Sequence, residues 1–182
     1  PSAVIAFLLT RRKTGITAQS LRAISRRVYP YLCDTPSEEA SMQIKNSLEV
    51  LGSSKTLSVK DGRLWSPKRK NPGYSELKIL SRLVEPILEE LFVILSLASK
   101  KQFNELRLRE KSESIMSYLR ELRKTSKVTN LTQGLAEEFI GKAISSSLIR
   151  VTEDKRVHAG KVAKLAIALF EPLMNEDVIE IL

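Results

Sequence analysis

The chain has 182 residues, of which 30 are Lys or Arg and 21 are Asp or Glu, so its formal net charge is +9. Hydrophobic residues make up 42% of it, too many for a disordered protein, and charges are too frequent for a protein embedded in a membrane. One Cys and one His exclude an internal disulfide and a Cys/His zinc site. We therefore expect no metal site and no cofactor.

The excess positive charge is concentrated in the first part of the chain. Residues 1–70 contain 13 basic and 5 acidic residues, a net charge of +8, whereas residues 71–182 contribute +1. Such a surface favours anionic partners, such as nucleic acid, acidic lipid headgroups or an acidic carrier protein. A solvated basic face without a specific partner is the alternative. The candidate contact residues are Arg11, Arg12, Lys13, Arg22, Arg26, Arg27, Lys68, Arg69 and Lys70.

The chain begins with a pattern typical of three helices. A short apolar helix is expected over residues 2–9, and Thr17 should cap a second helix that reaches about residue 32. A third helix is predicted over residues 37–51, with inward-facing apolar residues at helical spacing. Gly52 is expected to end this helix in a left-handed conformation, which glycine adopts without steric cost.

The clearest β signal follows these helices. Two alternating segments, residues 56–59 and 63–65, flank an Asp-Gly pair, which predicts a hairpin with a tight turn. A basic loop then leads to a long helix over about residues 75–99. Its apolar residues, Leu83 among them, form a wide stripe, and Pro86 is expected to kink it.

The second half predicts a similar series of elements. A charged helix is expected over residues 104–124, with Leu122 among its inward-facing residues, and another helix begins at Thr132. A second hairpin is expected over residues 148–158, and a last helix over about 161–169 ends in a kink or break at Pro172.

The two halves look like a duplication. Leu-Val-Glu-Pro at 83–86 corresponds to Leu-Phe-Glu-Pro at 169–172, and each half orders helices, a hairpin and a packing helix in the same way. The predicted fold is mainly α with two short β-hairpins, arranged as two tandem winged-helix-like repeats. We place the first module at residues 1–90 and the second at residues 91–182. Chance similarity of short helix–hairpin units is the alternative.

No residue stands out as catalytic. His158 has no orienting carboxylate that the sequence identifies, so a structural role is expected. Cys33 lies in a mixed local setting and is expected to be an inert thiol. The acidic pairs at 89–90 and 137–138 point apart on a helix, which predicts solvated faces rather than an acid/base couple.

A tandem winged-helix nucleic-acid-binding protein is an alternative function. Clustered basic residues suit phosphate contacts. However, the helix before the first hairpin carries Lys45 as its only basic residue, and the helix before the second carries only Lys142. A recognition helix at that position is expected to carry more. The pattern therefore argues against nucleic acid as the partner.

Several segments carry a resemblance to a known family. They are residues 1–7 (PSAVIAF), 29–32 (YPYL), 87–96 (ILEELFVILS), 138–148 (EFIGKAISSSL) and 161–165 (KVAKL). Together, and in this order, they resemble the carboxy-terminal region of the bacterial glycerol-3-phosphate acyltransferase. The related dihydroxyacetone-phosphate acyltransferases are more distant. The order of the segments, rather than any one of them, carries the specificity.

The resemblance implies that the parent enzyme transfers an acyl group from acyl-CoA or acyl carrier protein to glycerol 3-phosphate in phospholipid biosynthesis. In that family the acyl-transfer site lies in a separate upstream domain and uses a His and an Asp separated by four residues. Here the residue five after His158 is Ala163, so no catalytic residue is carried over. Residues 107–130 also look longer than the family's pattern.

By the same resemblance, this chain is a non-catalytic helical domain at the end of a longer enzyme. The opening on Pro1 within an apolar segment fits a piece of a longer protein. Its partners are then the upstream catalytic domain of the same chain and an anionic membrane surface, with acyl carrier protein as a further candidate. The implied location is peripheral, on the cytoplasmic face of the inner membrane.

Overall fold

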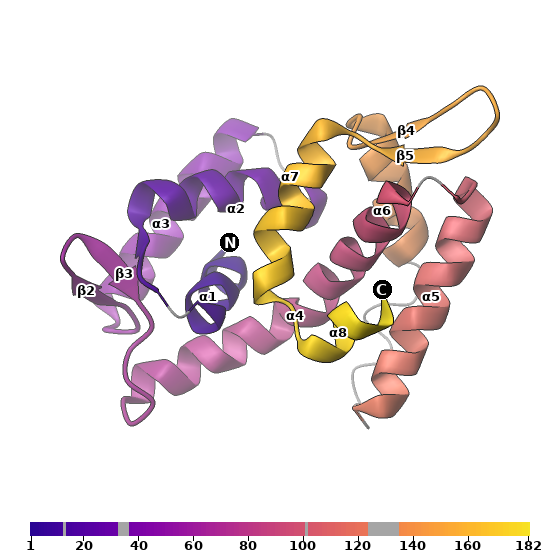
Figure 1. Cartoon of the computed structure of the whole chain (residues 1–182). Coiled ribbons are helices and arrows are strands. Elements are labelled where there is room, and N and C mark those ends of the chain that lie inside the picture. Colours follow the sequence, from indigo (N-terminus) through magenta and orange to yellow (C-terminus); the bar gives the residue numbers. More distant parts are fainter. Residues whose placement is uncertain (13, 33–36, 101, 124–134) are drawn as a thin grey trace. The chain divides into compact units, whose positions relative to one another are not determined.

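Figure 1 shows the computed structural model of the chain, which describes residues 1–12, 14–32, 37–100, 102–123 and 135–182. It is about 70% helical and contains two small antiparallel sheets, so the predicted mainly α class with two hairpins is confirmed. The chain divides into unit 1, Pro1–Glu85, and unit 2, Pro86–Leu182. Each unit is described separately below.

Unit 1 is built around a helix that is apolar on all sides. Its elements are α1 (Ser2–Arg11), β1 (Ile16–Thr17), α2 (Ala18–Leu32), α3 (Ser37–Ser53), β2 (Ser58–Lys60), β3 (Arg63–Trp65) and the first part of α4 (Pro72–Ser99). Six consecutive residues of α1, from Val4 to Leu9, are buried, and α2 and α3 pack against this helix. A helix that is hydrophobic all round belongs in a core, so α1 forms the centre of unit 1.

The sheet of unit 1 has the order β1-β3-β2, with antiparallel pairs throughout. The predicted hairpin is confirmed: Lys60 pairs with Arg63, and Asp61 and Gly62 form the turn with φ of 52° and 69°. Two successive positive φ angles define the turn type that Asp-Gly favours. Strand β1 was not predicted, because two residues are too few to show alternation.

The end of α3 differs from the prediction. Gly52 lies inside the helix, and Lys55 takes the left-handed conformation instead, with φ of 58°. The backbone N–H of Thr56 donates to Leu51 O at 3.2 Å and that of Lys55 to Gly52 O at 3.2 Å, the two bonds of a Schellman motif. The buried Thr56 hydroxyl also donates to Leu51 O at 2.6 Å, which fixes the turn at this position.

Unit 2 surrounds the second part of α4. Its further elements are α5 (Glu105–Leu122), α6 (Leu135–Ser145), β4 (Ile149–Val151), β5 (Val157–Ala159), α7 (Lys161–Phe170), the 3-10 helix η2 (Glu171–Leu173) and α8 (Glu176–Ile181). The predicted second hairpin and the break at Pro172 are confirmed. The predicted start at Thr132 lies outside the described residues.

Two leucines expected in apolar stripes are exposed. Leu83 on α4 is 60% exposed and Leu122 at the end of α5 is 55% exposed, so their predicted inward orientation is wrong. On α4 the buried residues Leu77, Val84 and Leu88 follow one line, and Leu83 is turned about 100° from Val84. In the first part of α4 the buried stripe is therefore narrower than the apolar pattern indicates, whereas residues 88–98 are buried on all sides of the helix. The helix continues through Pro86, and the kink expected there stays a prediction.

Candidate functional site

The basic residues predicted from sequence that the structure describes lie in different settings. Arg11 is half-buried: its guanidinium forms an ion pair with Glu85 and lies 5.7 Å from the centre of the Phe7 ring. This residue therefore ties α1 to α4 within unit 1. Its charge is already engaged inside the unit.

The predicted contact residues form three groups along the chain, at residues 11–13, 22–27 and 68–70. The other residues of the first two groups differ in their exposure. Arg12 is half-buried, directly after α1, and Arg22 is exposed on α2. Lys13 and the side chains of Arg26 and Arg27 lie outside the described residues. Among the side chains that the structure describes on α2, Arg22 is thus an exposed cation.

The third group forms an exposed loop surface. The loop between β3 and α4 (Figure 1) contains Lys68, Arg69 and Lys70, and all three side chains are exposed. Where the loop ends, the chain passes close to the backbone of Lys55. A Cβ added at Gly73 would lie 2.8 Å from Lys55 O. Lys55 is exposed too, and sequence reasoning missed it. We call Lys55, Lys68, Arg69 and Lys70 the basic loop surface.

The sheet topology decides which other cations lie near this surface. Because β1 and β3 are antiparallel, the chain before Ile16 and the chain after Trp65 leave the sheet at the same end. Arg12 therefore lies at the end of the sheet where the basic loop surface begins. Lys60 and Arg63, which flank the hairpin turn, lie at the opposite end.

Unit 2 contains a half-buried charged cluster, of which Glu89 is the fully buried member. Arg123 donates to both carboxylate oxygens of Glu89, at 2.7 and 3.2 Å, and to both of Asp177, at 2.6 and 2.7 Å. Asn175 Nδ2 adds a bond of 2.8 Å to Glu89 Oε1. The bond from Arg123 holds the pKa of Asp177 below its usual range. The cluster joins α4, the end of α5 and the beginning of α8.

The expectation that Glu89 and Glu90 are solvated is wrong. Each side chain is only 2% exposed. Glu89 has Arg123 as its partner, 34 residues later, which no local pattern could indicate. Burial raises the pKa of Glu90 to about 7, while nearby Arg120 lowers it and Glu113 raises it.

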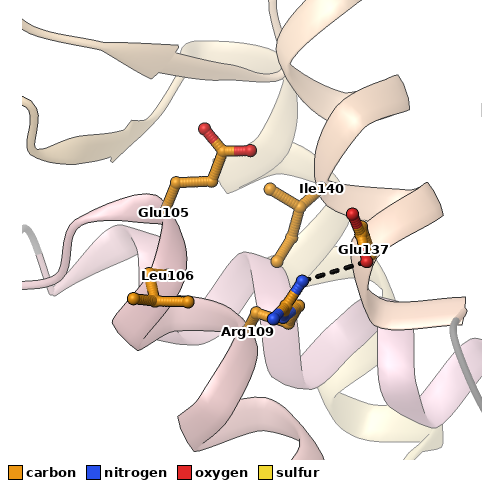
Figure 2. A pocket seen from close by; sticks show the side chains of 5 residues that line it. All are labelled: Glu105, Leu106, Arg109, Glu137 and Ile140. Carbon is orange, nitrogen blue, oxygen red and sulfur yellow. Dashed lines mark hydrogen bonds and ion pairs between the residues drawn. The ribbon is translucent and has the colours of Figure 1, made fainter.

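Figure 2 shows a shallow pocket between α5 and α6, with a volume of about 280 Å³. Arg109 Nη1 and Glu137 Oε2 form an ion pair across it at 2.9 Å. Glu105, Leu106 and Ile140 complete its lining. Because the Arg109 guanidinium is already paired, the pocket offers little to an anionic ligand.

Two further candidates from the sequence are His158 and Cys33. His158 is half-buried on β5, and Cys33 lies outside the described residues. Across the described part of the chain, no group of three or more His, Cys, Asp or Glu residues could hold a metal ion. Within the same residues, no helix is long and apolar enough to cross a membrane.

The protein is thus mainly helical and consists of two units, and its basic loop surface lies in unit 1. The chain matches the family model of the glycerol-3-phosphate acyltransferase C-terminal region over residues 1–159. It therefore belongs to this family, which is part of an acyltransferase of phospholipid biosynthesis. No curated protein and no solved structure gives a significant match.

Proposed function

We propose that the chain is the non-catalytic C-terminal domain of a glycerol-3-phosphate 1-O-acyltransferase. The reaction of the whole enzyme is the transfer of an acyl group from acyl-CoA or acyl carrier protein to glycerol 3-phosphate. The family match over residues 1–159 carries this proposal. The sequence around the one histidine supports the non-catalytic role, because Ala163 stands five residues after His158.

An assay of acyl transfer tests this proposal. The 182-residue chain alone should release no CoA from acyl-CoA when glycerol 3-phosphate is added. The same chain extended upstream along its own gene should release CoA, and only with glycerol 3-phosphate present. Activity of the isolated chain would overturn the non-catalytic role. Inactivity of the extended protein with both acyl donors would overturn the assignment to this reaction.

We further propose that the basic loop surface of unit 1 contacts anionic phospholipid, which seats the enzyme peripherally on the inner face of a membrane. Lys68, Arg69 and Lys70 are exposed and adjacent, which supports contact with a flat array of phosphates. Each Lys or Arg near such a surface contributes about 1 kcal/mol. Three of them then strengthen the partitioning by about a hundredfold.

Vesicle sedimentation at two salt concentrations tests the lipid contact. Binding to vesicles with phosphatidylglycerol should fall about a hundredfold when Lys68, Arg69 and Lys70 are all replaced by Ala. The matched control replaces three exposed lysines of unit 2, Lys111, Lys161 and Lys164, and should change binding little. Equal losses, or binding to acyl carrier protein or duplex DNA but not to vesicles, would overturn the lipid proposal.

We also propose that the two units are winged-helix-like repeats. In unit 1 the order helix, β1, two helices and a hairpin, with β1 paired to β3, supports this. In unit 2 a bridge between Asn104 and Arg156 occupies the place of β1, between α4 and α5. Lys55 and Ser147, both with φ near 60°, precede the two hairpins.

Nucleic-acid binding gains no further support, because Lys45 on α3 is paired with Glu49.

A further inference from the structure

Unit 2 encloses a carboxyl group that its surroundings do not satisfy. Glu90 lies on the part of α4 in unit 2, and its Oε2 atom has no hydrogen-bond partner among the described residues. A buried carboxylate ion with an oxygen that lacks a partner is more costly than the neutral acid. The burial accordingly raises the pKa of Glu90 to about 7, against an ordinary value of 4.5.

The charged groups that act on Glu90 come from α5. Arg120 lowers its pKa and Glu113 raises it. Arg120 donates from Nε to the backbone oxygen of Met116 at 3.0 Å, so this arginine is held partly by its own helix. The two charges on α5 therefore oppose each other, and burial decides the protonation of Glu90.

The other charged groups of unit 2 near this part of α4 belong to the Arg123 cluster and are paired within it. Glu89, its neighbour on α4, binds Arg123 and Asn175. Asp177 of α8 binds the same Arg123. This cluster holds the end of α5 against α4, so a change at Glu90 is expected to act on the turns of α5 that precede Arg123.

We propose that Glu90 is a proton-operated switch in the contact between α4 and α5 of unit 2. The protonated side chain is accommodated in the apolar interior. When it releases its proton to solvent, the carboxylate requires hydration, and the two helices open locally to admit water. The switch responds to pH near neutrality and does not depend on the function proposed above.

The direction of the response follows from proton binding. The closed state binds the proton more tightly than the open state, in which the carboxyl has its ordinary affinity. The closed state is therefore most favoured at low pH and loses this advantage as pH rises through about 7. The release of this one proton increases the equilibrium constant for local opening about tenfold between about pH 6 and pH 8.

Amide hydrogen exchange of the full chain tests the switch. After correction for the intrinsic pH dependence of exchange, protection of residues 86–99 and 105–122 should fall about tenfold between about pH 6 and pH 8. Glu90→Gln keeps the shape of the side chain but cannot ionise, so its protection should not change over this range. Glu110→Gln, an exposed change on α5, should behave as the unaltered chain does.

Two results overturn the proposal. One is protection that is independent of pH in the unaltered chain, and the other is an equal fall in Glu90→Gln. If Glu90→Gln does not fold, the carboxyl carbon resonance of Glu90 in the unaltered chain decides instead. A titration midpoint near 7 supports the switch, and one near the ordinary 4.5 rejects it.

Discussion

Arg123 joins three parts of unit 2 through one guanidinium, which binds Glu89 and Asp177 with two bonds each. We predict that Arg123→Ala destabilises the protein by about 3–5 kcal/mol, because it leaves the Glu89 carboxylate buried without its cation. Chemical denaturation followed by far-UV circular dichroism measures this change.

Arg109→Ala is the matched control for this prediction. It also removes an arginine paired with a glutamate, but Glu137 is 74% exposed, and such a pair contributes about 0–1 kcal/mol. If the two variants lose equal stability, burial of Glu89 is not what gives the Arg123 cluster its importance.

Gly15 shows how close packing restricts a single position. A Cβ at Gly15 would lie 2.3 Å from Trp65 Cε2, so the indole must move to accommodate an alanine. We predict that Gly15→Ala costs about 1–3 kcal/mol and changes the fluorescence of Trp65. Gly141→Ala on α6 meets nothing within 4 Å and should instead gain up to about 1 kcal/mol, since alanine favours a helix. Thermal unfolding of both variants checks the signs, and a stabilising Gly15→Ala would contradict the packing.

At the scale of elements, the end of α3 depends on a residue with an unfavourable backbone. Lys55 adopts φ of 58°, which costs about 1–2 kcal/mol for a residue other than glycine. We predict that Lys55→Gly stabilises the protein by about 1 kcal/mol, as measured by denaturation. Asn46→Gly in the exposed interior of α3 should have the opposite sign and cost about 0.3 kcal/mol, the difference between the helix propensities of the two residues. If both variants are destabilised, the positive φ of Lys55 does not reduce the stability of the protein.

The elements that the sequence predicts correctly are those with local signals. Asp61 and Gly62 specify the hairpin turn by their own conformational preferences, and Thr17 caps α2 by accepting a bond of 3.1 Å from the Ser20 N–H. The same kind of local preference predicts that α3 ends at Gly52. The helix continues past Gly52 because the hydrogen bonds of Thr56, four residues beyond it, decide where the helix ends.

The residues of the candidate sites also divide into those with a local signal in the sequence and those that depend on tertiary packing. Lys68, Arg69 and Lys70 are consecutive in sequence, so their common exposed loop could be predicted. The approach of Lys55 to this loop depends on tertiary packing at Gly73 and could not. The burial of Glu89 depends on an arginine 34 residues away, and adjacent acidic residues on a helix otherwise indicate a solvated face.

At the scale of the whole molecule, the charge follows the division into units. Unit 1, Pro1–Glu85, has a net charge of +8, and unit 2, Pro86–Leu182, has a net charge of +1. The buried ion pairs of Arg123 lie in unit 2, whereas the basic loop surface lies in unit 1. Unit 1 also uses charge structurally in the Arg11–Glu85 ion pair, but the exposed cations of its basic loop surface are available for an anionic partner.

Each unit also has its own core, which leads to a prediction about unfolding. Leu8 is fully buried in α1 of unit 1, and Leu119 is 1% exposed on α5 of unit 2. Trp65, the one tryptophan of the chain, lies in unit 1, so its fluorescence reports on that unit while circular dichroism reports on both. We predict that Leu8→Ala lowers the stability measured by fluorescence by about 2–5 kcal/mol. Leu119→Ala should lower the transition seen by circular dichroism and leave the fluorescence transition in place. Coincident shifts of both signals in both variants would instead mean that the two cores unfold as one cooperative unit.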